Sequence, residues 1–283
     1  MEIRNVVIIG AGQMGSGIAQ VCAQAGLNVI LYDINQDAID RGISSISSNL
    51  NRSIAKGKMT EELKHDILQR IQASLSLDIA ETADLAIEAA TENMSIKSAI
   101  FKELDQICSS HAILASNTSS LPITEIAAVT KRPEQVIGMH FMNPVPVMQL
   151  VEIIRGLATA EEVCQTVKDL AVKMGKTAVE VHDYPGFVSN RILMPMINEA
   201  IYTVYEGVAS IEDVDQVMKL GMNHPMGPLA LADFIGLDTC LSIMEILYEG
   251  FSDSKYRPCP LLRKYVKAGR LGRKTGQGFY TYG

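Results

Sequence analysis

A glycine-rich turn near the N-terminus is the feature that most constrains the fold. The segment Gly10–Gly15 reads Gly-Ala-Gly-Gln-Met-Gly. It follows residues 6–9, a β-branched run typical of a parallel strand that is covered on both faces. Residues 18–25 have a helical composition, and residues 29–32 predict a second strand. This strand, turn, helix and strand together have the length of a βαβ crossover.

The spacing of the glycines predicts a site for the pyrophosphate of a dinucleotide. The pattern Gly-x-Gly-x-x-Gly allows a tight turn, close approach of the backbone to the pyrophosphate, and close helix–strand packing. The helix N-terminus offers N–H groups and a positive dipole to phosphate. The bare pattern occurs by chance, so its place between a strand and a helix carries the argument. The predicted cofactor-binding residues of this segment are Gly10, Gly12, Gln13, Met14 and Gly15.

Asp33 indicates which dinucleotide binds. It ends the second strand, 18 residues after Gly15. A carboxylate at this place accepts hydrogen bonds from the adenosine ribose and repels a 2′-phosphate. Residues 34–36 supply no basic side chain for such a phosphate, so NAD is favoured over NADP. FAD shares the pattern, but a single unit in a chain of this length favours a nicotinamide cofactor. The alternative for Asp33 is a solvated residue that caps the next helix.

A helical hairpin is predicted between the first βα unit and the rest of the sheet. Thr60 can cap its second helix. Arg52 and Lys56 lie one turn apart on the first helix, away from its apolar stripe. They form either a solvated face or a binding site for an anion. The apolar stripe of the first helix, over residues 37–58, is Ile39, Ile43, Ile46, Leu50 and Ile54.

The remaining chain divides into an α/β part and a helical part. Residues 187–250 are rich in Met, Leu, Ile and Ala and contain no convincing strand. We therefore expect an α/β domain over residues 1–184 with a mostly parallel sheet, followed by a smaller all-helical domain over residues 185–283. The further predicted strands are 85–89, 112–115, 136–140, 150–154 and 178–181.

Charge and hydrophobicity argue against several classes of partner. The net charge is −7 and no basic run is present, which disfavours nucleic acid. No apolar run approaches the ~20 residues that span a bilayer, so no membrane partner is expected. The five cysteines are scattered and form no Cys-x-x-Cys pair, which predicts free thiols and no metal site. Without a secretory or transit segment, we expect a cytoplasmic protein.

Two residues at the ends of neighbouring predicted strands form a candidate acid–base pair. His140 ends a strand, where sites in open α/β sheets lie, and an imidazole titrates near neutral pH. Glu152 interrupts the apolar run 150–154, where a carboxylate is costly unless it is paired. Alone, His140 would read as a core histidine satisfied by the backbone. The nearby Asn143-Pro144 turn and the otherwise unexplained Glu152 favour the pair.

The sequence resembles the 3-hydroxyacyl-CoA dehydrogenase family along essentially its whole length, and its bacterial short-chain members most closely. The resemblance implies a Rossmann-type dinucleotide-binding domain with an inserted helical hairpin, then a smaller all-α domain for substrate binding and dimerisation. It implies NAD-linked interconversion of (S)-3-hydroxyacyl-CoA and 3-oxoacyl-CoA, with a four-carbon acyl group. The segments that carry it are Ser116–Ser120, His140–Pro144, Pro185–Arg191 and Gly272–Tyr280.

The resemblance also assigns roles to single residues. It implies that His140 is the general acid and base, oriented by Glu152, and that the protein is a homodimer or a higher homo-oligomer. Without it, Ser119 would read as a helix cap and Asn190 as an ordinary helix residue. The other implied contacts are Ser119 and Asn190 to the substrate, Arg52 and Lys56 to the CoA phosphates, and Glu92, Lys97, Asn117 and Asn143 around the nicotinamide and its ribose.

Other interpretations remain open. A hydroxyacid dehydrogenase with a catalytic lysine on the first long helix after the sheet is disfavoured, because residues 187–206 contain no lysine. A gulonate-type dehydrogenase that does not use CoA shares the His–Glu pair, and only Arg52 and Lys56 separate it from the CoA enzymes. A catalytically idle NAD-binding relative is disfavoured because the implied catalytic residues are present together.

Overall fold

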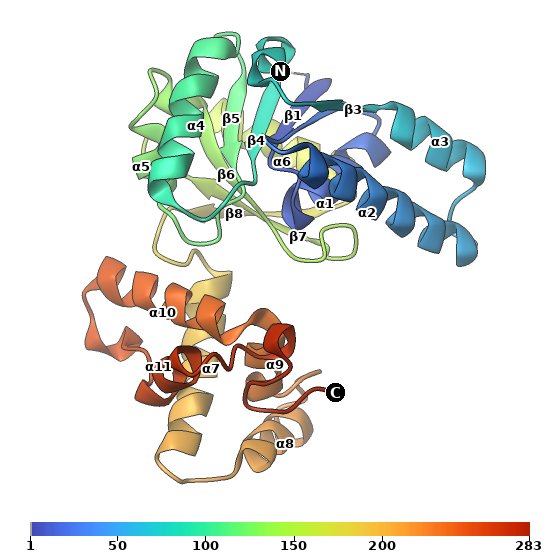
Figure 1. The fold of residues 1–283 in the computed structure, drawn as a ribbon. Coiled ribbons are helices and arrows are strands. Elements are labelled where there is room, and N and C mark those ends of the chain that lie inside the picture. The colour runs from blue at the N-terminus through green and yellow to red at the C-terminus, as the bar shows by residue number, and fades with distance from the viewer. Residues whose placement is uncertain (1) are drawn as a thin grey trace. The chain divides into compact units, whose positions relative to one another are not determined.

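The computed structural model describes residues 2–283, which form two compact units (Figure 1). The first unit ends at Asp183 and combines a sheet with helices. The second runs from Tyr184 to Gly283 and is helical. Each unit is described by itself.

An eight-stranded sheet forms the centre of the first unit, in the order β3-β2-β1-β4-β5-β6-β7-β8. Neighbouring strands pair in parallel except at β6 and β7, which are antiparallel. The predicted mostly parallel sheet is therefore confirmed. The strands are β1 Asn5–Ile9, β2 Asn28–Tyr32, β3 Ile71–Ser74, β4 Leu85–Glu88, β5 Ile113–Ser116, β6 Val136–Phe141, β7 Leu150–Arg155 and β8 Thr177–His182.

Helices pack against the sheet and bury its apolar strands. Alternate residues of β1, such as Val6 and Ile8, are fully buried in a core shared with α1, α2, α3 and α6. Helix α4 contacts β4, and helix α5 contacts β6. The helices of this unit are α1 Gln13–Gln24, α2 Gln36–Ala55, α3 Glu61–Gln69, α4 Met94–Ile107, α5 Ile123–Ala127 and α6 Glu161–Lys173, with short 3-10 turns at Leu77–Thr82 and Pro133–Gln135.

The predicted helical hairpin is present as α2 and α3, which extend away from the sheet in Figure 1. Ile39, Ile46 and Leu50 are at most 1% exposed, whereas Ile43 and Ile54 of the same stripe are only half-buried. As predicted, the Thr60 side chain caps α3 by accepting a hydrogen bond from Leu63 N.

One strand is absent from the sequence-based prediction. The edge strand β3 pairs with β2 through residues 71–74, Ile-Gln-Ala-Ser. Two of its four residues are exposed and none is fully buried, so no apolar pattern marks it. Pairing with β2, and not hydrophobic burial, makes this segment a strand.

The second unit is helical, as its composition predicts, and contains five α-helices. Two buried carboxylates fix its C-terminal segment. Asp215 accepts hydrogen bonds from Leu229 N and from the Tyr280 hydroxyl, and Asp233 accepts from Phe279 N. The helices are α7 Ser189–Tyr205, α8 Ile211–Gly221, α9 Pro228–Ile235, α10 Leu237–Phe251 and α11 Pro260–Lys267, with short turns at Ser254–Tyr256 and Arg273–Thr275.

Three further features concern the described residues 2–283 as a set. None of their helices is long and apolar enough to cross a membrane. They contain no group of three or more His, Cys, Asp or Glu side chains that could hold a metal ion. All five cysteines are free and buried, and burial raises the pKa of the Cys22 thiol to about 12.

Candidate active site

The glycine loop connects β1 to α1 and has the geometry of a phosphate cradle. Gly10 has φ +103°, which an L side chain rarely adopts. A Cβ on Gly15 would lie 1.8 Å from the Gly10 carbonyl oxygen, so only glycine lets the helix pack against the loop. A Cβ on Gly12 would meet nothing within 4 Å, and Gly12 is the N-cap of α1. The open space therefore lies where the helix N-terminus and its N–H groups could meet a pyrophosphate.

Asp33 follows β2 and is held against the glycine loop. Its Oδ2 accepts a hydrogen bond from Ala11 N at 2.8 Å, and its Oδ1 accepts from Asn35 N at 3.1 Å. The cap of α2 is Asn35, whose side chain accepts from Asp37 N and Ala38 N. The alternative interpretation of Asp33 as the helix cap is therefore wrong. Asp33 lines a cavity of about 430 Å³ together with Gly10 and Gly12.

The loop after β6 lies against α1. Gln13 Nε2 donates to Asn143 Oδ1 at 3.1 Å, so two predicted cofactor-binding residues are in direct contact. A Cβ on Gly17 would lie 2.8 Å from the Val145 Cβ, so this glycine permits the close approach. Asn117, after β5, accepts a hydrogen bond from Phe141 N at 2.9 Å. These contacts join the loops that follow β1, β5 and β6, at the carboxyl ends of these parallel strands.

His140 and Glu152 face each other across the antiparallel pair of β6 and β7. They are direct register partners, and His140 Nδ1 lies 2.8 Å from Glu152 Oε2. Their side chains are 8% and 3% exposed. A carboxylate so buried is stabilised by a charged or hydrogen-bonded partner. A carboxylate 2.8 Å from Nδ1 favours the tautomer in which Nδ1 carries the proton and donates it to Glu152.

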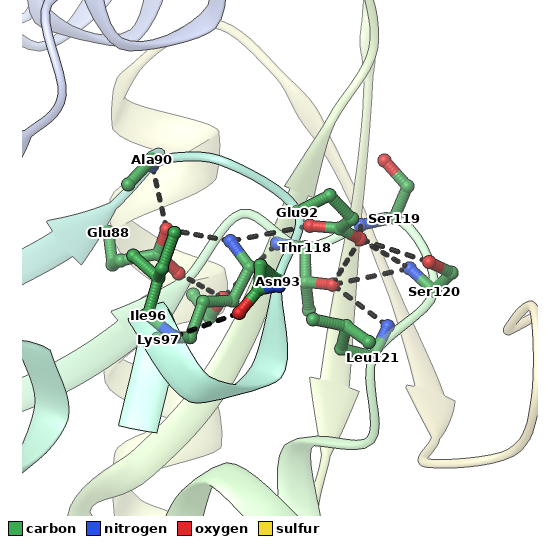
Figure 2. A network of polar contacts seen from close by, with 11 residues as sticks. Glu88, Ala90, Glu92, Asn93, Ile96, Lys97, Thr118, Ser119, Ser120 and Leu121 are labelled. Carbon is green, nitrogen blue, oxygen red and sulfur yellow. Dashed lines mark hydrogen bonds and ion pairs between the residues drawn. The ribbon is translucent and has the colours of Figure 1, made fainter. Parts of the chain in front are cut away.

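Glu92 organises the loop that carries Ser119 (Figure 2). Its Oε1 accepts hydrogen bonds from the Thr118 hydroxyl at 2.6 Å, from Ser119 N at 2.9 Å, and from both the amide and the hydroxyl of Ser120. Burial raises the pKa of Glu92, but the Lys97 charge and these hydrogen bonds outweigh it and lower the pKa overall. In Figure 2 the Ser119 hydroxyl points away from Glu92. Glu92 thus holds the backbone of this loop, while the Ser119 side chain is oriented away from Glu92.

A buried ion pair lies beneath this loop. Lys97 and Glu88 are at most 1% exposed, and Lys97 Nζ lies 2.7 Å from Glu88 Oε1. Lys97 also lies 3.3 Å from Glu92 Oε2. Glu88 accepts further hydrogen bonds from Ala90 N and from the Ser116 hydroxyl, both at 2.7 Å. The ion pair therefore links β4, α4 and β5 near the carboxyl ends of these two strands, where the candidate site lies.

The predicted CoA-binding residues lie on the hairpin. Arg52 and Lys56 are exposed at the C-terminal end of α2, and Arg52 Nη2 donates to the Ser48 hydroxyl at 3.4 Å. A third cation of α2, Arg41, lines a small cavity together with Gly12 and Gln13. Gly42 lets α2 approach there, because a Cβ on it would lie 2.8 Å from the Ala11 carbonyl oxygen.

Asn190 belongs to the second unit. It lies in the first turn of α7, is 8% exposed, and donates its backbone N–H to the Gly186 carbonyl at 3.1 Å. Gly186 has φ +73°. A tight turn at Gly186 therefore precedes α7, and Asn190 is buried in the first turn of the helix.

Sequence reasoning missed several residues at this edge of the sheet. Glu88 carried a usable signal, because it is a carboxylate inside the apolar strand 85–89, as Glu152 is inside its own strand. Gly17 and Gly42 carried a weaker one, since each is a glycine within a helix. Arg41 could be found only once α2 had been placed beside the glycine loop.

Comparison with known proteins identifies the family. Residues 5–184 match the model for the 3-hydroxyacyl-CoA dehydrogenase NAD binding domain, and residues 186–282 match the model for the C-terminal domain of the same family. A probable 3-hydroxybutyryl-CoA dehydrogenase of Bacillus subtilis (strain 168) is 67% identical over 282 residues, covering 100% of this chain and 98% of the relative. A 3-hydroxybutyryl-CoA dehydrogenase of Bradyrhizobium diazoefficiens is 56% identical over 99% of this chain and 96% of its own.

A solved structure agrees with these matches. The crystal structure of (S)-3-hydroxybutyryl-CoA dehydrogenase from Ralstonia eutropha has a TM-score of 0.98, is 54% identical, and covers 100% of both chains. Both family models and the relatives thus extend over both units of the chain. The chain belongs to the 3-hydroxyacyl-CoA dehydrogenase family.

Proposed function

We propose that this protein is an NAD-dependent dehydrogenase that interconverts (S)-3-hydroxyacyl-CoA and 3-oxoacyl-CoA, with 3-hydroxybutyryl-CoA and acetoacetyl-CoA as its substrate pair. The observation that carries the proposal is the buried His140–Glu152 contact of 2.8 Å at the C-terminal end of β6. Oxidation of a secondary alcohol needs a base for the hydroxyl proton, and a paired imidazole is suited to that task.

We propose that the hydride is transferred by the cofactor and the proton by His140. When bound to this chain, the nicotinamide would supply the hydride acceptor for oxidation of the substrate carbon and, as NADH, the hydride donor for reduction. In reduction His140 gives the proton on Nε2 to the oxygen at C3, and in oxidation it takes that proton back. Glu152 holds Nδ1–H and stabilises the imidazolium. Ser119 and Asn190 donate hydrogen bonds to the substrate.

The chain's residues fit the dinucleotide. Gly10, Gly12 and Asp33 line one cavity, and Gly12 is the N-cap of α1, with open space at the position of its Cβ. In the proposal, Gly10–Gly15 holds the pyrophosphate and Asp33 holds the adenosine ribose. Glu92, Lys97, Asn117 and Asn143 hold the nicotinamide end; Lys97 does so through Glu92, because its ammonium is buried between two carboxylates.

The assay that tests the proposal follows the oxidation of NADH. Rapid turnover is expected with acetoacetyl-CoA, and none with free acetoacetate. Turnover of free acids would instead support the gulonate-type or hydroxyacid alternative. The absence of turnover with any 3-oxo substrate, together with tight NADH binding, would support the idle relative. The joint presence of the His–Glu pair and Ser119 speaks against that last outcome.

Replacing Arg52 and Lys56 together by alanine is expected to raise KM for acetoacetyl-CoA roughly tenfold and leave kcat unchanged. Each exposed charge pair with a CoA phosphate contributes about 0.7 kcal/mol, so the two together contribute about 1.4 kcal/mol, which is a factor of ten. The matched control is Lys64→Ala, a cation on the other helix of the hairpin, which should leave KM unchanged.

A truncated substrate makes that experiment decisive. Acetoacetyl-pantetheine lacks the nucleotide phosphates of CoA, so its KM should be the same in the wild type and in the double variant. An equal rise of KM for both substrates would show that the hairpin acts on the acyl or pantetheine part, and would overturn the phosphate role of Arg52 and Lys56.

The proposal also covers assembly and location. We propose that the second unit, over residues 185–283, forms the interface of a homodimer or a higher homo-oligomer. Large apolar side chains on its surface support this, among them Val208 and Leu220, which are 71% and 76% exposed. Light scattering after gel filtration tests it. A cytoplasmic location is supported by the five free, buried cysteines.

A further inference from the structure

The cavity beside Asp33 has a second carboxylate that the proposed function does not use. Asp33 and Tyr32 lie at the C-terminal end of β2 on one wall of the 430 Å³ cavity. Glu103, on α4, lines the same cavity. Seventy positions separate the two carboxylates in the sequence, and the α/β fold brings them to one cavity.

The position of Glu103 on α4 follows from the helical repeat. Ile96, Ile100 and Glu103 lie at positions i, i+4 and i+7, which share one face of a helix. All three line the cavity. The first two supply apolar surface, as do Ile34 and Leu77 from other segments. Such walls suit the flat adenine base of a dinucleotide, and Glu103 adds a negative charge at the end of the row.

The fields of the two carboxylates overlap in the cavity. Tyr32 lies next to Asp33 in the chain, and its phenol responds to both charges. Burial raises the pKa of Tyr32 first, the charge of Glu103 raises it further, and the charge of Asp33 adds to both. Glu103 is thus close enough to act on a group at the adenosine end of the cavity.

The charges around the cavity are of one sign. Among the described residues that line it, the only acidic or basic side chains besides the Tyr32 phenol are the carboxylates Asp33 and Glu103. A dinucleotide with an unmodified ribose brings only hydroxyl groups to this place. A 2′-phosphate brings about two negative charges, and nothing in the lining neutralises them.

We propose that Glu103 is a second specificity-determining residue, which acts with Asp33 to exclude NADPH from the adenosine end of the cavity. Asp33 selects by contact, because it hydrogen-bonds the ribose hydroxyls. Glu103 selects by repulsion across the cavity and makes no contact that NADH requires. The inference rests on the proposed function, since it assumes that the cavity holds the adenosine of NAD.

Neutralising Glu103 tests the proposal in a binding experiment. The dissociation constants of NADH and NADPH are measured from the fluorescence of the reduced nicotinamide, since the chain has no Trp to report binding. Glu103→Gln should bind NADPH about tenfold more tightly than the wild type, with the NADH value changed by less than about twofold. Glu103→Asp keeps the charge and should behave like the wild type. Asp33→Asn combined with Glu103→Gln should bind NADPH more tightly than either single variant.

Salt and a remote variant separate local repulsion from other causes. Repulsion between exposed charges is screened, so the difference between wild type and Glu103→Gln should shrink as ionic strength rises from about 0.01 M to 1 M. Asp169→Asn on α6 removes the same charge from a distant helix and should leave NADPH binding unchanged. Circular dichroism checks that each variant is folded.

Three outcomes would overturn the inference. They are unchanged NADPH binding in Glu103→Gln, equal tightening by Asp169→Asn, and an equal change for NADH and NADPH, which would place Glu103 at the shared adenine. Failure of the premise that this cavity holds the adenosine of NAD looks different, because the wild type would then bind neither NADH nor NADPH. Failure of the proposed reaction alone would leave NADH binding intact and would show as no turnover of acetoacetyl-CoA.

Discussion

Replacing His140 by glutamine should lower kcat for acetoacetyl-CoA reduction by about 10²–10⁴-fold. Glutamine can still meet Glu152 through its amide, but it cannot give up or take a proton at neutral pH. The dissociation constant of NADH should change little, because the proposed contacts to the dinucleotide come from the glycine loop, Asp33 and the residues around the nicotinamide, and not from His140. Stopped-flow measurement of NADH oxidation gives kcat, and nicotinamide fluorescence gives the binding constant.

Two further variants show whether the loss comes from the proton. Glu152→Gln keeps a hydrogen-bond partner for Nδ1 and removes only the charge, so kcat should fall less than in His140→Gln. His182→Gln changes an exposed histidine on β8 and should leave kcat unchanged. If His140→Gln retains more than a tenth of wild-type kcat, His140 is not the general acid and base.

The sequence predicts local features of this protein well because their causes are local. The strand before the glycine loop is predicted over residues 6–9 and is found as Asn5–Ile9. A β-branched run, a glycine turn and a helix cap each act over a few residues. The strand at residues 71–74 escapes prediction because only its pairing with β2 makes it a strand.

The candidate site likewise contains residues that the sequence predicts and residues that only the fold brings into it. Glu152 could be matched to His140 because each interrupts or ends an apolar strand, and the strands prove to be neighbours in register. The same argument applied to Glu88 would have predicted a buried partner, and Lys97 on the next helix supplies it at 2.7 Å. Glu103 gave no such signal, because it is an ordinary exposed residue until the fold places it on the wall of the Asp33 cavity.

The buried Glu88–Lys97 pair gives the largest effect expected on stability. Lys97→Met should lower the free energy of unfolding by about 3–5 kcal/mol, because it leaves the Glu88 carboxylate fully buried without its cation. Urea unfolding followed by circular dichroism measures the change. The control is Lys64→Met, whose partner Glu61 is 69% exposed, and it should cost less than about 1 kcal/mol.

Removing both charges separates the ion pair from the packing of its side chains. In Lys97→Met combined with Glu88→Gln, the glutamine oxygen can still accept from Ala90 N, and no fully buried carboxylate remains at position 88 without its cation. Glu92, which is 38% exposed, also loses the Lys97 charge but keeps its hydrogen bonds from Thr118 and Ser120. The double variant should therefore recover much of the stability lost in Lys97→Met. The two losses would simply add if the cost came from the methionine packing badly on α4, and the buried charge would then not be the cause. We expect the double variant to recover stability but not kcat. Lys97 also contacts Glu92, and Glu92 holds the loop of Ser119 through hydrogen bonds from Thr118 and Ser120. Recovery of stability without recovery of kcat would therefore show that the ion pair also positions this loop.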